Sequence, residues 1–451
     1  MSKWTLESWK DYILNQAPGW RNDKALKDAI YKLQNNPPLV FKNEIKLLKQ
    51  RLSKVHDGEY FIIQGGDCAE TFSDFSANLI KNKLNILLQM SVLLSYKTSM
   101  KTIRIGRMAG QFAKPRTNSI EIINDFEYPS YRGDAINGLN CNVESRTPNP
   151  NRMIKAYDQS AFTLNLIRSM INSGYTSILN ANQWDLDFIN KSPQVKEYND
   201  VINKIQKALS FIKTVDRKSP SLDQIELYEF FASHEGLILE YEQALTRYDA
   251  IDKKYYNHSG HMIWVGDRTR AINGSHIEFV SGIENPIGIK LGPTIDNNEL
   301  IEIIKKVNPI NEKGKIILIA RFGVDYIETK LPNLIDKINK NNLNVIWMCD
   351  PMHGNTYNND QGIKTRHFNT IVKELELYMK IHKQSHTFPG GIHIEFTSED
   401  VTECLGGLQN IDDNELLSRY ETACDPRLNN QQSLELIFKL NNLMKQGSSD
   451  V

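Results

Sequence analysis

The chain carries no excess charge of either sign and no long hydrophobic run. Lysine plus arginine and aspartate plus glutamate each number 54 among 451 residues, so the formal net charge is zero. A neutral chain has no global field that would favour nucleic acid or an anionic membrane, so any anion binding must be local. The apolar runs, such as KIILIARF (315–322), fall far short of the roughly 20 residues that span a bilayer. We therefore expect a soluble protein that needs neither nucleic acid nor a membrane as partner.

Cysteine is scarce, and its spacing forms no recognisable motif. The five cysteines are an odd set, and no charged leader precedes an apolar segment, which favours a reducing cytoplasm and free thiols. The chain has no Cys-x-x-Cys pair, no His-Glu-x-x-His helix and no Gly-x-Gly-x-x-Gly or Walker loop. These absences exclude the local zinc motifs and give no support to a nucleotide-binding open sheet.

Short β-type runs recur along the chain, each followed by a longer amphipathic stretch. Strands that alternate with helices predict parallel βαβ units, and eight such units close a (β/α)8 barrel. An open doubly wound sheet is the alternative. The third run is the weakest, because YTSILNANQW (175–184) competes with it. The eight runs span residues 59–67, 101–110, 226–236, 262–270, 285–293, 315–323, 344–354 and 391–400.

Two segments lie outside this alternation. Residues 1–50 show apolar positions at helical spacing around a Pro37-Pro38 break, and we interpret them as an N-terminal extension of one or two helices. Residues 51–451 would form the catalytic barrel. Between about residues 156 and 216 the helical pattern exceeds what one barrel connection needs, so we expect a helical insertion there.

Each run changes at its C-terminal end from apolar residues to glycine, charged or metal-capable ones. In a barrel that end carries the active site, so the pattern indicates an enzyme. A mixed set of sulfur, nitrogen and oxygen donors suits manganese, iron, cobalt or zinc. Taken singly, each donor is also typical of a buried inert thiol or an ordinary ion pair at a sheet end. The candidate ligands are Cys68, His353, Glu395 and Asp425.

Cationic side chains stand inside or just after apolar strands, where burial is costly unless an anion meets them. Lys290 in GIKLGP and Arg321 in IARFG are the clearest cases. Several such cations would suit two phosphates, or a phosphate and a carboxylate. The alternative is that they pair with nearby acids such as Asp67 and Asp350. The wider set contains Arg107, Lys114, Arg116, Arg268, Arg270, Lys364 and Arg366.

Three histidines, His234, His261 and His276, could transfer protons, but capping or structural hydrogen bonds are favoured for all three. Cys68, with Glu70 close by, could also be a redox thiol, and a bound metal would lower the thiol pKa equally well.

Taken in order, long motifs of the chain closely resemble the class II (plant and microbial type) 3-deoxy-D-arabino-heptulosonate 7-phosphate (DAHP) synthases. The resemblance runs from about Pro37 to Leu440. It implies a metal-dependent (β/α)8 barrel that condenses phosphoenolpyruvate with erythrose 4-phosphate, the first step of the shikimate pathway to chorismate and the aromatic amino acids. The motifs are FIIQGGDCAETF (61–72), GRMAGQFAKPR (106–116), YRGDAIN (131–137), ASHEGLILEYEQALTR (232–247), HMIWVGDRTRAINGSHIEFVSGIENPIGIKLGP (261–293), CDPMHGNT (349–356), KTRHF (364–368), FPGGIHIEFTSEDVTECLGG (388–407) and YETACDPRLNNQQSLEL (420–436).

The resemblance assigns the same four residues as metal ligands: Cys68, His353, Glu395 and Asp425. Manganese or cobalt is the expected metal, with zinc or iron as alternatives. The resemblance also implies that phosphoenolpyruvate binds Arg107, Lys290 and Arg321, with Asp267 and Arg268 adjoining.

Erythrose 4-phosphate would bind Lys114, Pro115, Arg116 and Thr117, with help from Arg268. Thr117 stands where family members often have serine, so the hydroxyl is retained. Lys290 is the expected proton carrier, and the expected catalytic residues are Lys290, Arg107 and Cys68.

In some family members the N-terminal extension and the helical insertion form subunit interfaces and aromatic amino-acid sites. We therefore expect a cytoplasmic homodimer or homotetramer with tryptophan, phenylalanine or tyrosine as effectors, and chorismate mutase as a candidate partner. The alternatives are a paralogue in a secondary pathway, a non-catalytic regulatory partner and a metal-dependent aldolase with another substrate. All four expected ligands are present, which argues against the regulatory partner.

Overall fold

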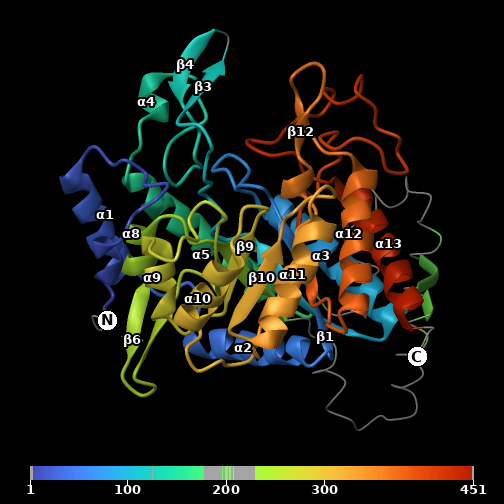
Figure 1. Ribbon diagram of the computed structural model, residues 1–451. Helices are drawn as coiled ribbons and strands as arrows, with labels where there is room; N and C mark the ends of the chain where they lie inside the picture. The colour runs from blue at the N-terminus through green and yellow to red at the C-terminus, as the bar shows by residue number, and fades with distance from the viewer. Residues whose placement is uncertain are drawn as a thin grey trace.

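The computed structural model describes residues 4–123, 125–176 and 229–448, with a few separate residues between 196 and 207. Eight parallel strands close into a barrel in the order β1-β14-β11-β10-β9-β8-β5-β2, with helices around it (Figure 1). The predicted (β/α)8 barrel is confirmed, and each of the eight predicted runs contains one barrel strand. These strands are β1 (Tyr60–Gly66), β2 (Lys101–Arg107), β5 (Phe231–Glu235), β8 (Met262–Val265), β9 (Ile287–Leu291), β10 (Ile316–Ala320), β11 (Ile346–Cys349) and β14 (Gly391–Glu395).

The helices follow the strands or precede the barrel. Among the described residues they are, in chain order, η1 (Ser8–Asp11), α1 (Asp23–Asn35), α2 (Lys42–His56), α3 (Ala77–Thr98), α4 (Val143–Arg146), α5 (Asn151–Asn172), α8 (Leu239–Ala244), α9 (Ser275–Ser281), α10 (Asn297–Val307), α11 (Ile327–Lys340), η4 (His353–Asn355), α12 (Phe368–Gln384) and α13 (Asn430–Ser448).

Within the part of the chain that the structure describes, three small antiparallel hairpins lie outside the barrel. They pair β3 (Ile120–Ile123) with β4 (Phe126–Pro129), β6 (Thr246–Asp249) with β7 (Lys254–Asn257), and β12 (Tyr357–Asn358) with β13 (Lys364–Thr365). In Figure 1 the β3–β4 hairpin and β12 rise above the upper end of the barrel, where its strands finish. They thus flank the face on which the site is expected.

The barrel interior is closed from below by α2, which lies across the lower end of the barrel in Figure 1. Leu48, Leu52 and Val55 of α2 share one buried apolar cluster with inward-facing residues of the strands, such as Ile62 and Ile319. The helix begins inside the predicted extension and ends inside the predicted barrel. The sequence segment before β1 therefore contributes to the barrel core.

The N-terminal segment ahead of α1 packs on the barrel through tryptophan side chains. Trp4 donates from Nε1 to the carbonyl of Glu278 at 2.9 Å, and Trp9 donates from Nε1 to Gln243 Oε1 at 2.9 Å. Both contacts reach residues more than 200 positions away in the sequence, at separations of 274 and 234. These contacts hold the segment against the barrel.

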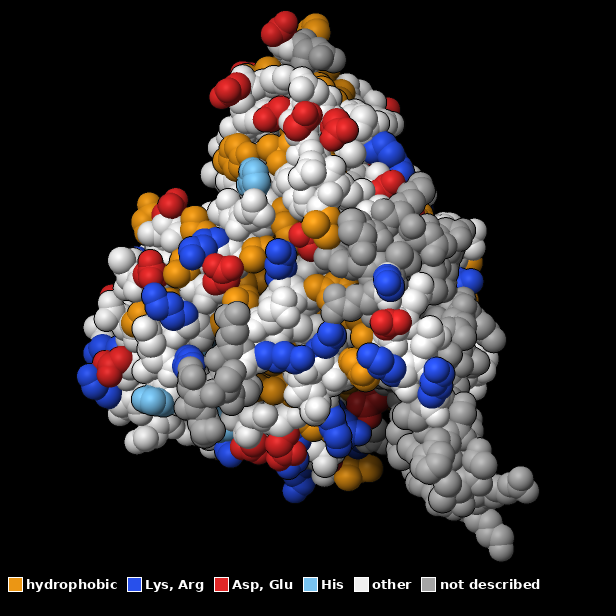
Figure 2. Space-filling view, turned by 90° about the vertical axis from the view of Figure 1, so that its right-hand side faces the viewer, with side chains coloured by type: hydrophobic (Ala, Val, Ile, Leu, Met, Phe, Trp, Pro, Cys, Tyr) orange, Lys and Arg blue, Asp and Glu red, His pale blue; other side chains and the backbone are white. Residues whose placement is uncertain are grey.

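The expected insertion between residues 156 and 216 falls partly on α5, a continuous helix that ends at Asn172. Most of the rest of that range, like most of the competing run 175–184, lies outside the described residues. No helix within the described ranges is long and apolar enough to cross a membrane. On the face drawn in Figure 2, basic and acidic side chains are both present, in keeping with the neutral charge balance.

Gly391 is a test of the packing between β14 and β1. It pairs with Ile62, and a Cβ built there would lie 2.6 Å from the carbonyl oxygen of Ile62. Because a backbone atom cannot move aside cheaply, we expect Gly391→Ala to lower the free energy of unfolding by about 1–3 kcal/mol. Urea denaturation measures the shift. Gly236→Ala is the control, since the nearest atom to its Cβ would be the terminal Cδ1 of Ile263, at 3.1 Å, and no backbone atom is among its nearest neighbours; equal shifts would contradict the packing argument.

Candidate active site

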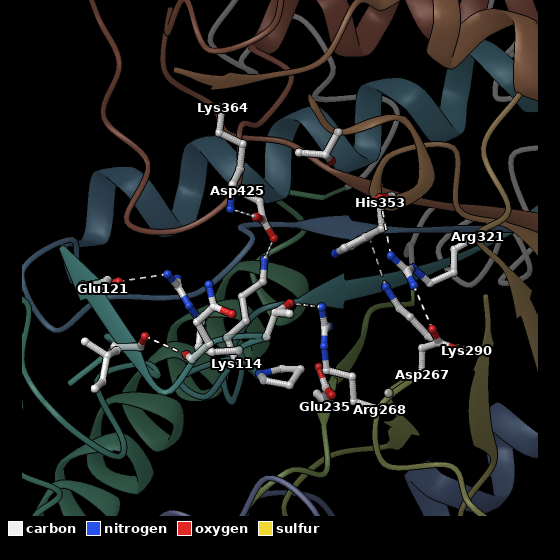
Figure 3. Close-up of a pocket in the computed structure, with 18 of the residues that line it drawn as sticks. Lys114, Glu121, Glu235, Asp267, Arg268, Lys290, Arg321, His353, Lys364 and Asp425 are labelled. Carbon is white, nitrogen blue, oxygen red and sulfur yellow. Dashed lines mark hydrogen bonds and ion pairs between the residues drawn. The ribbon is translucent and has the colours of Figure 1, made fainter. Parts of the chain in front are cut away.

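A cavity of about 730 Å³ opens at the C-terminal ends of the barrel strands (Figure 3). It contains most of the residues that the sequence analysis assigns to substrates, drawn from three strand ends and the loop after β2. Basic and acidic side chains both line it, so it suits ligands that carry anionic groups together with hydroxyl or carbonyl groups. The predicted substrate residues that line it are Lys114, Pro115, Arg116, Thr117, Asp267, Arg268, Lys290 and Arg321.

Lys290 projects from β9 and is 5% exposed. Its Nζ donates to Asp350 Oδ2 at 2.7 Å and lies 5.8 Å from the centre of the Trp264 ring. Burial lowers the pKa of the Lys290 ammonium, and the Asp350 carboxylate opposes that shift. The charge of Lys290 is therefore partly compensated, and its ammonium borders the cavity.

Arg321 is held in place by Asp267. Its Nη1 donates to Asp267 Oδ2 at 3.0 Å, while Arg270 Nε donates to Asp267 Oδ1 at 3.0 Å. Burial alone would raise the pKa of the Asp267 carboxyl, but Arg321 and Arg270 hold it below its ordinary value. The same acid thus fixes two guanidinium groups. Across the cavity, Arg268 donates to Thr117 Oγ1 at 2.5 Å, which ties the strand end after β8 to the loop after β2.

Arg107 is the one predicted substrate residue outside the described lining of this cavity. It is 2% exposed, and its guanidinium donates to the carbonyls of Asp67 and Cys68, both at 3.1 Å, and to Glu395 Oε1 at 2.9 Å. The strand register explains the reach, because Gly66 of β1 pairs with both Arg107 and Glu395. A Cβ on Gly66, whose φ is +148°, would lie 2.7 Å from the Arg107 carbonyl.

Three of the four predicted metal ligands converge. One ligand atom each of His353, Glu395 and Asp425 lies within 4.8 Å of the others. His353 Nε2 is 3.1 Å from Glu395 Oε1, while its Nδ1 is 2.8 Å from Asp350 Oδ2. A carboxylate behind the imidazole is the arrangement that orients metal-ligating histidines. This donor set fits a divalent cation of the manganese-to-zinc series.

The Cys68 thiol is buried beside this group. Its Sγ is not within 4.8 Å of all three of these ligand atoms. Its Sγ lies 3.2 Å from Thr422 Oγ1. A hydrogen bond with the Cys424 thiol, followed by the charge of Lys114, lowers the pKa of Cys68 against the opposing effect of burial. The lowered pKa favours the thiolate, which is the form that binds metals.

Lys114, predicted to bind substrate, also touches the ligand carboxylates. Its Nζ contacts Asp425 Oδ2 and lies 3.3 Å from Glu395 Oε1, and Lys364 Nζ lies 3.1 Å from Asp425 Oδ1. Burial would raise the pKa of Asp425, but Lys114 holds it well below its ordinary value. The predicted metal and aldose-phosphate sites therefore share a border.

The structure adds Glu235 to the cavity wall. It ends β5, and its Oε1 is buried with no hydrogen-bond partner among the described residues. Burial raises the pKa of the Glu235 carboxyl, and Lys290 and then Lys114 oppose that shift. The signal was present in the motif ASHEG, where the sequence analysis considered His234. His234 instead bonds Glu242 Oε1 at 2.8 Å beneath the surface.

The other two histidines are also in structural hydrogen bonds, as favoured from the sequence. His261 Nδ1 accepts the backbone N–H of Ala232 at 2.9 Å, and His276 Nε2 lies 3.0 Å from the carbonyl of Leu237. Arg366, one of the wider cationic set, is fully buried with Nη2 2.8 Å from Glu395 Oε2. The Arg366 guanidinium therefore compensates part of the charge of the Glu395 carboxylate.

Arg427 connects the two segments that carry Cys68 and Asp425. Its Nη1 donates to Asp67 Oδ1 at 2.7 Å, and its Nη2 donates to Glu403 Oε1 at 2.8 Å. Asp67 precedes Cys68, and Arg427 lies two residues after Asp425. The buried ion pair between Arg427 and Asp67 therefore ties the segment that carries the Cys68 thiol to the segment that carries the Asp425 carboxylate.

Together, fold and site define a class: a (β/α)8 barrel enzyme with a cation-rich cavity beside a cluster of metal-binding side chains. The model of the class-II DAHP synthetase family matches residues 4–441. The chain therefore belongs to the class-II DAHP synthetase family, and the predicted family is confirmed.

Curated relatives agree with this assignment. The chain is 43% identical over 431 residues to the phospho-2-dehydro-3-deoxyheptonate aldolase of Streptomyces coelicolor. This alignment covers 96% of this chain and 95% of the relative. It is 41% identical to the enzyme of that name from Neurospora crassa, with 96% and 93% covered. It is also 41% identical to phospho-2-dehydro-3-deoxyheptonate aldolase AroG of Mycolicibacterium smegmatis, with 95% and 92% covered.

The role of Arg427 can be tested through stability. Arg427→Met leaves Glu403, which is fully buried, and Asp67 without a guanidinium partner. Breaking a buried pair in this way costs about 3–5 kcal/mol, so we expect a large loss in urea denaturation. Arg419→Met is the matched control, because its pairs with Glu399 and Glu421 are exposed and worth less than about 1 kcal/mol. Similar losses in both variants would contradict the account.

Proposed function

We propose a residue-by-residue assignment of the family's reaction to this cavity. As a member of the class-II DAHP synthetase family, the chain condenses phosphoenolpyruvate with erythrose 4-phosphate to give DAHP and inorganic phosphate, the first step of the shikimate pathway. The observation that carries the assignment is the border that the cation-lined cavity shares with the His353, Glu395 and Asp425 cluster.

Cys68, His353, Glu395 and Asp425 would hold the divalent metal. When bound, that metal supplies Lewis-acid polarisation of the aldehyde oxygen. The lowered pKa of Cys68 and the carboxylate behind His353 both support this ligand set. We propose manganese or cobalt as the metal, with zinc or iron as alternatives, because the thiolate, imidazole and carboxylate donors suit each of them.

Phosphoenolpyruvate would bind where Lys290, Arg321 and Arg268 meet. Asp267 and Asp350 fix two of these cations before the substrate arrives, so little of the binding energy is lost to orienting them. Arg107 adds its charge from beneath, since its guanidinium and the Lys290 ammonium lie near the same Trp264 ring, at 5.2 and 5.8 Å from its centre.

Erythrose 4-phosphate would place its phosphate against Lys114, Arg116 and Thr117, with Arg268 joining through its bond to Thr117. This position leaves the aldehyde end pointing towards the metal-binding cluster, because Lys114 borders both. Carbon 3 of the enol can then attack the aldehyde carbon with the two substrates held in line.

Water then adds to carbon 2, and phosphate leaves by cleavage of its C–O bond. Lys290 is our candidate for proton transfer, because its ammonium borders the cavity and burial lowers its pKa. Glu235 is a second candidate, since it lines the cavity, its Oε1 has no partner among the described residues, and a carboxylate can accept a proton from water.

The assignment predicts metal-dependent turnover that needs Cys68. After treatment with a chelator, the protein should consume phosphoenolpyruvate in the presence of erythrose 4-phosphate only when manganese or cobalt is restored. We expect Cys68→Ser to abolish or severely reduce this turnover. Loss of the enol absorbance of phosphoenolpyruvate measures it. Cys141→Ser, at an exposed free cysteine, is the matched control. Full activity of Cys68→Ser would remove the thiol from the ligand set.

We also propose that tryptophan, phenylalanine or tyrosine regulates the enzyme, and that it works in the cytoplasm as a homodimer or homotetramer, with chorismate mutase as a candidate partner. The five free cysteines support a reducing compartment.

The resemblance of the N-terminal extension to that of family members supports regulation by aromatic amino acids. We expect at least one of the three amino acids, or a combination, to lower the rate. A rate unchanged by all three, singly and together, would contradict regulation.

A further inference from the structure

The side chain of Gln16, in the N-terminal segment, bonds to the loop after β2. The carboxamide of Gln16 accepts a hydrogen bond from the backbone N–H of Arg116 at 3.0 Å and donates one to the backbone carbonyl of Arg116 at 3.1 Å. The two bonds satisfy both backbone groups of one loop residue, as an adjacent strand would. A shift of the loop would break both bonds together.

Arg132 forms hydrogen bonds with both the N-terminal segment and the loop after β2. Its guanidinium donates to the carbonyls of Gln16 and Ala17, each at 2.5 Å, and its own carbonyl accepts the N–H of Lys114 at 2.9 Å. Burial lowers the pKa of the Arg132 guanidinium, and its bonds among the described residues go to neutral carbonyls. Arg132 therefore orients backbone and does not neutralise an acid.

The segment that carries Gln16 is itself fixed to the barrel. Ser275, at the start of α9, donates its N–H to the carbonyl of Ile13 and its hydroxyl to the carbonyl of Tyr12, both at 3.0 Å. Gln16 adopts a φ of +59°, in the left-handed region that residues other than glycine rarely occupy. Such a conformation persists where surrounding contacts determine it, as they do here.

The head group of Arg116 is fixed separately, because its Nη2 donates to Glu121 Oε2 in β3 at 2.9 Å. Gln16 holds the backbone of the loop, and Glu121 holds the guanidinium. We propose that Gln16 is a positioning residue for the aldose phosphate: by fixing the backbone of Arg116, it sets the spacing of Lys114, Arg116 and Thr117 around the phosphate. This inference rests on the proposed assignment of erythrose 4-phosphate to that loop.

Hydrogen exchange tests the contact without reference to activity. We expect the amides of residues 112–120 to exchange faster in Gln16→Ala than in the wild type, because the Arg116 N–H loses its acceptor. Asn15→Ala, at the exposed neighbouring residue, is the control and should leave exchange unchanged. Gln16→Glu keeps the acceptor but loses the donor, so it should give an intermediate rate. Unchanged exchange in a folded Gln16→Ala protein would overturn the inference.

Steady-state kinetics test the consequence. Loss of two hydrogen bonds that place the loop should raise KM for erythrose 4-phosphate by about 5- to 30-fold, with kcat and KM for phosphoenolpyruvate within about twofold of the wild type. A general structural defect would instead lower the melting temperature and affect both substrates. Faster exchange with an unchanged KM would overturn the positioning role. A wild-type protein that fails to consume both substrates would contradict the proposed function, and hydrogen exchange would still decide whether Gln16 holds the loop.

Discussion

The buried carboxylate of Glu395, at the end of β14, is the group on which the rest of the site depends. It is fully buried, and four positively charged or chargeable side chains surround it: Arg107, Lys114, His353 and Arg366. Burial would raise the pKa of Glu395, but these partners hold it well below its ordinary value. An ionised acid at this position can both bind a metal and fix the cations around it.

Its position follows from the barrel. Parallel strands place their C-terminal residues at one end, and the register sets Arg107, Gly66 and Glu395 side by side across β2, β1 and β14. Gly66 has no side chain, so the guanidinium can cross β1 to the carboxylate. Because Asp267 and Asp350 are likewise paired with cations, the cations Arg321 and Lys290 are held in place before substrates bind.

Much of the fold was predictable because a buried parallel strand is a short continuous apolar run. All eight runs contain a barrel strand, and several residues at their ends, such as Lys290 and Arg321, line one cavity. The family resemblance supplied the pairing of these residues with particular substrates. What the sequence could not supply were contacts between distant segments. The bond between Gln16 and Arg116 spans 100 residues, and neither residue carries a local sign of it.

The sequence also could not show in which direction a side chain points. Periodicity placed Arg107 at a strand end but could not show that its guanidinium turns beneath Glu395 and away from the described cavity lining. It also could not distinguish His234 from Glu235, since neighbouring residues of a strand point to opposite sides. Only the register of the barrel decides which one faces the cavity.

The central claim is that Glu395 organises a metal-binding cluster, and a titration with manganese tests it most directly. Calorimetry on wild-type protein and on Glu399→Gln, a nearby acid outside the cluster, should each show one Mn²⁺ bound per chain. The account predicts that folded Glu395→Gln protein, checked by its circular dichroism, loses this binding. Glu395→Gln that binds Mn²⁺ as tightly as the wild type would contradict it.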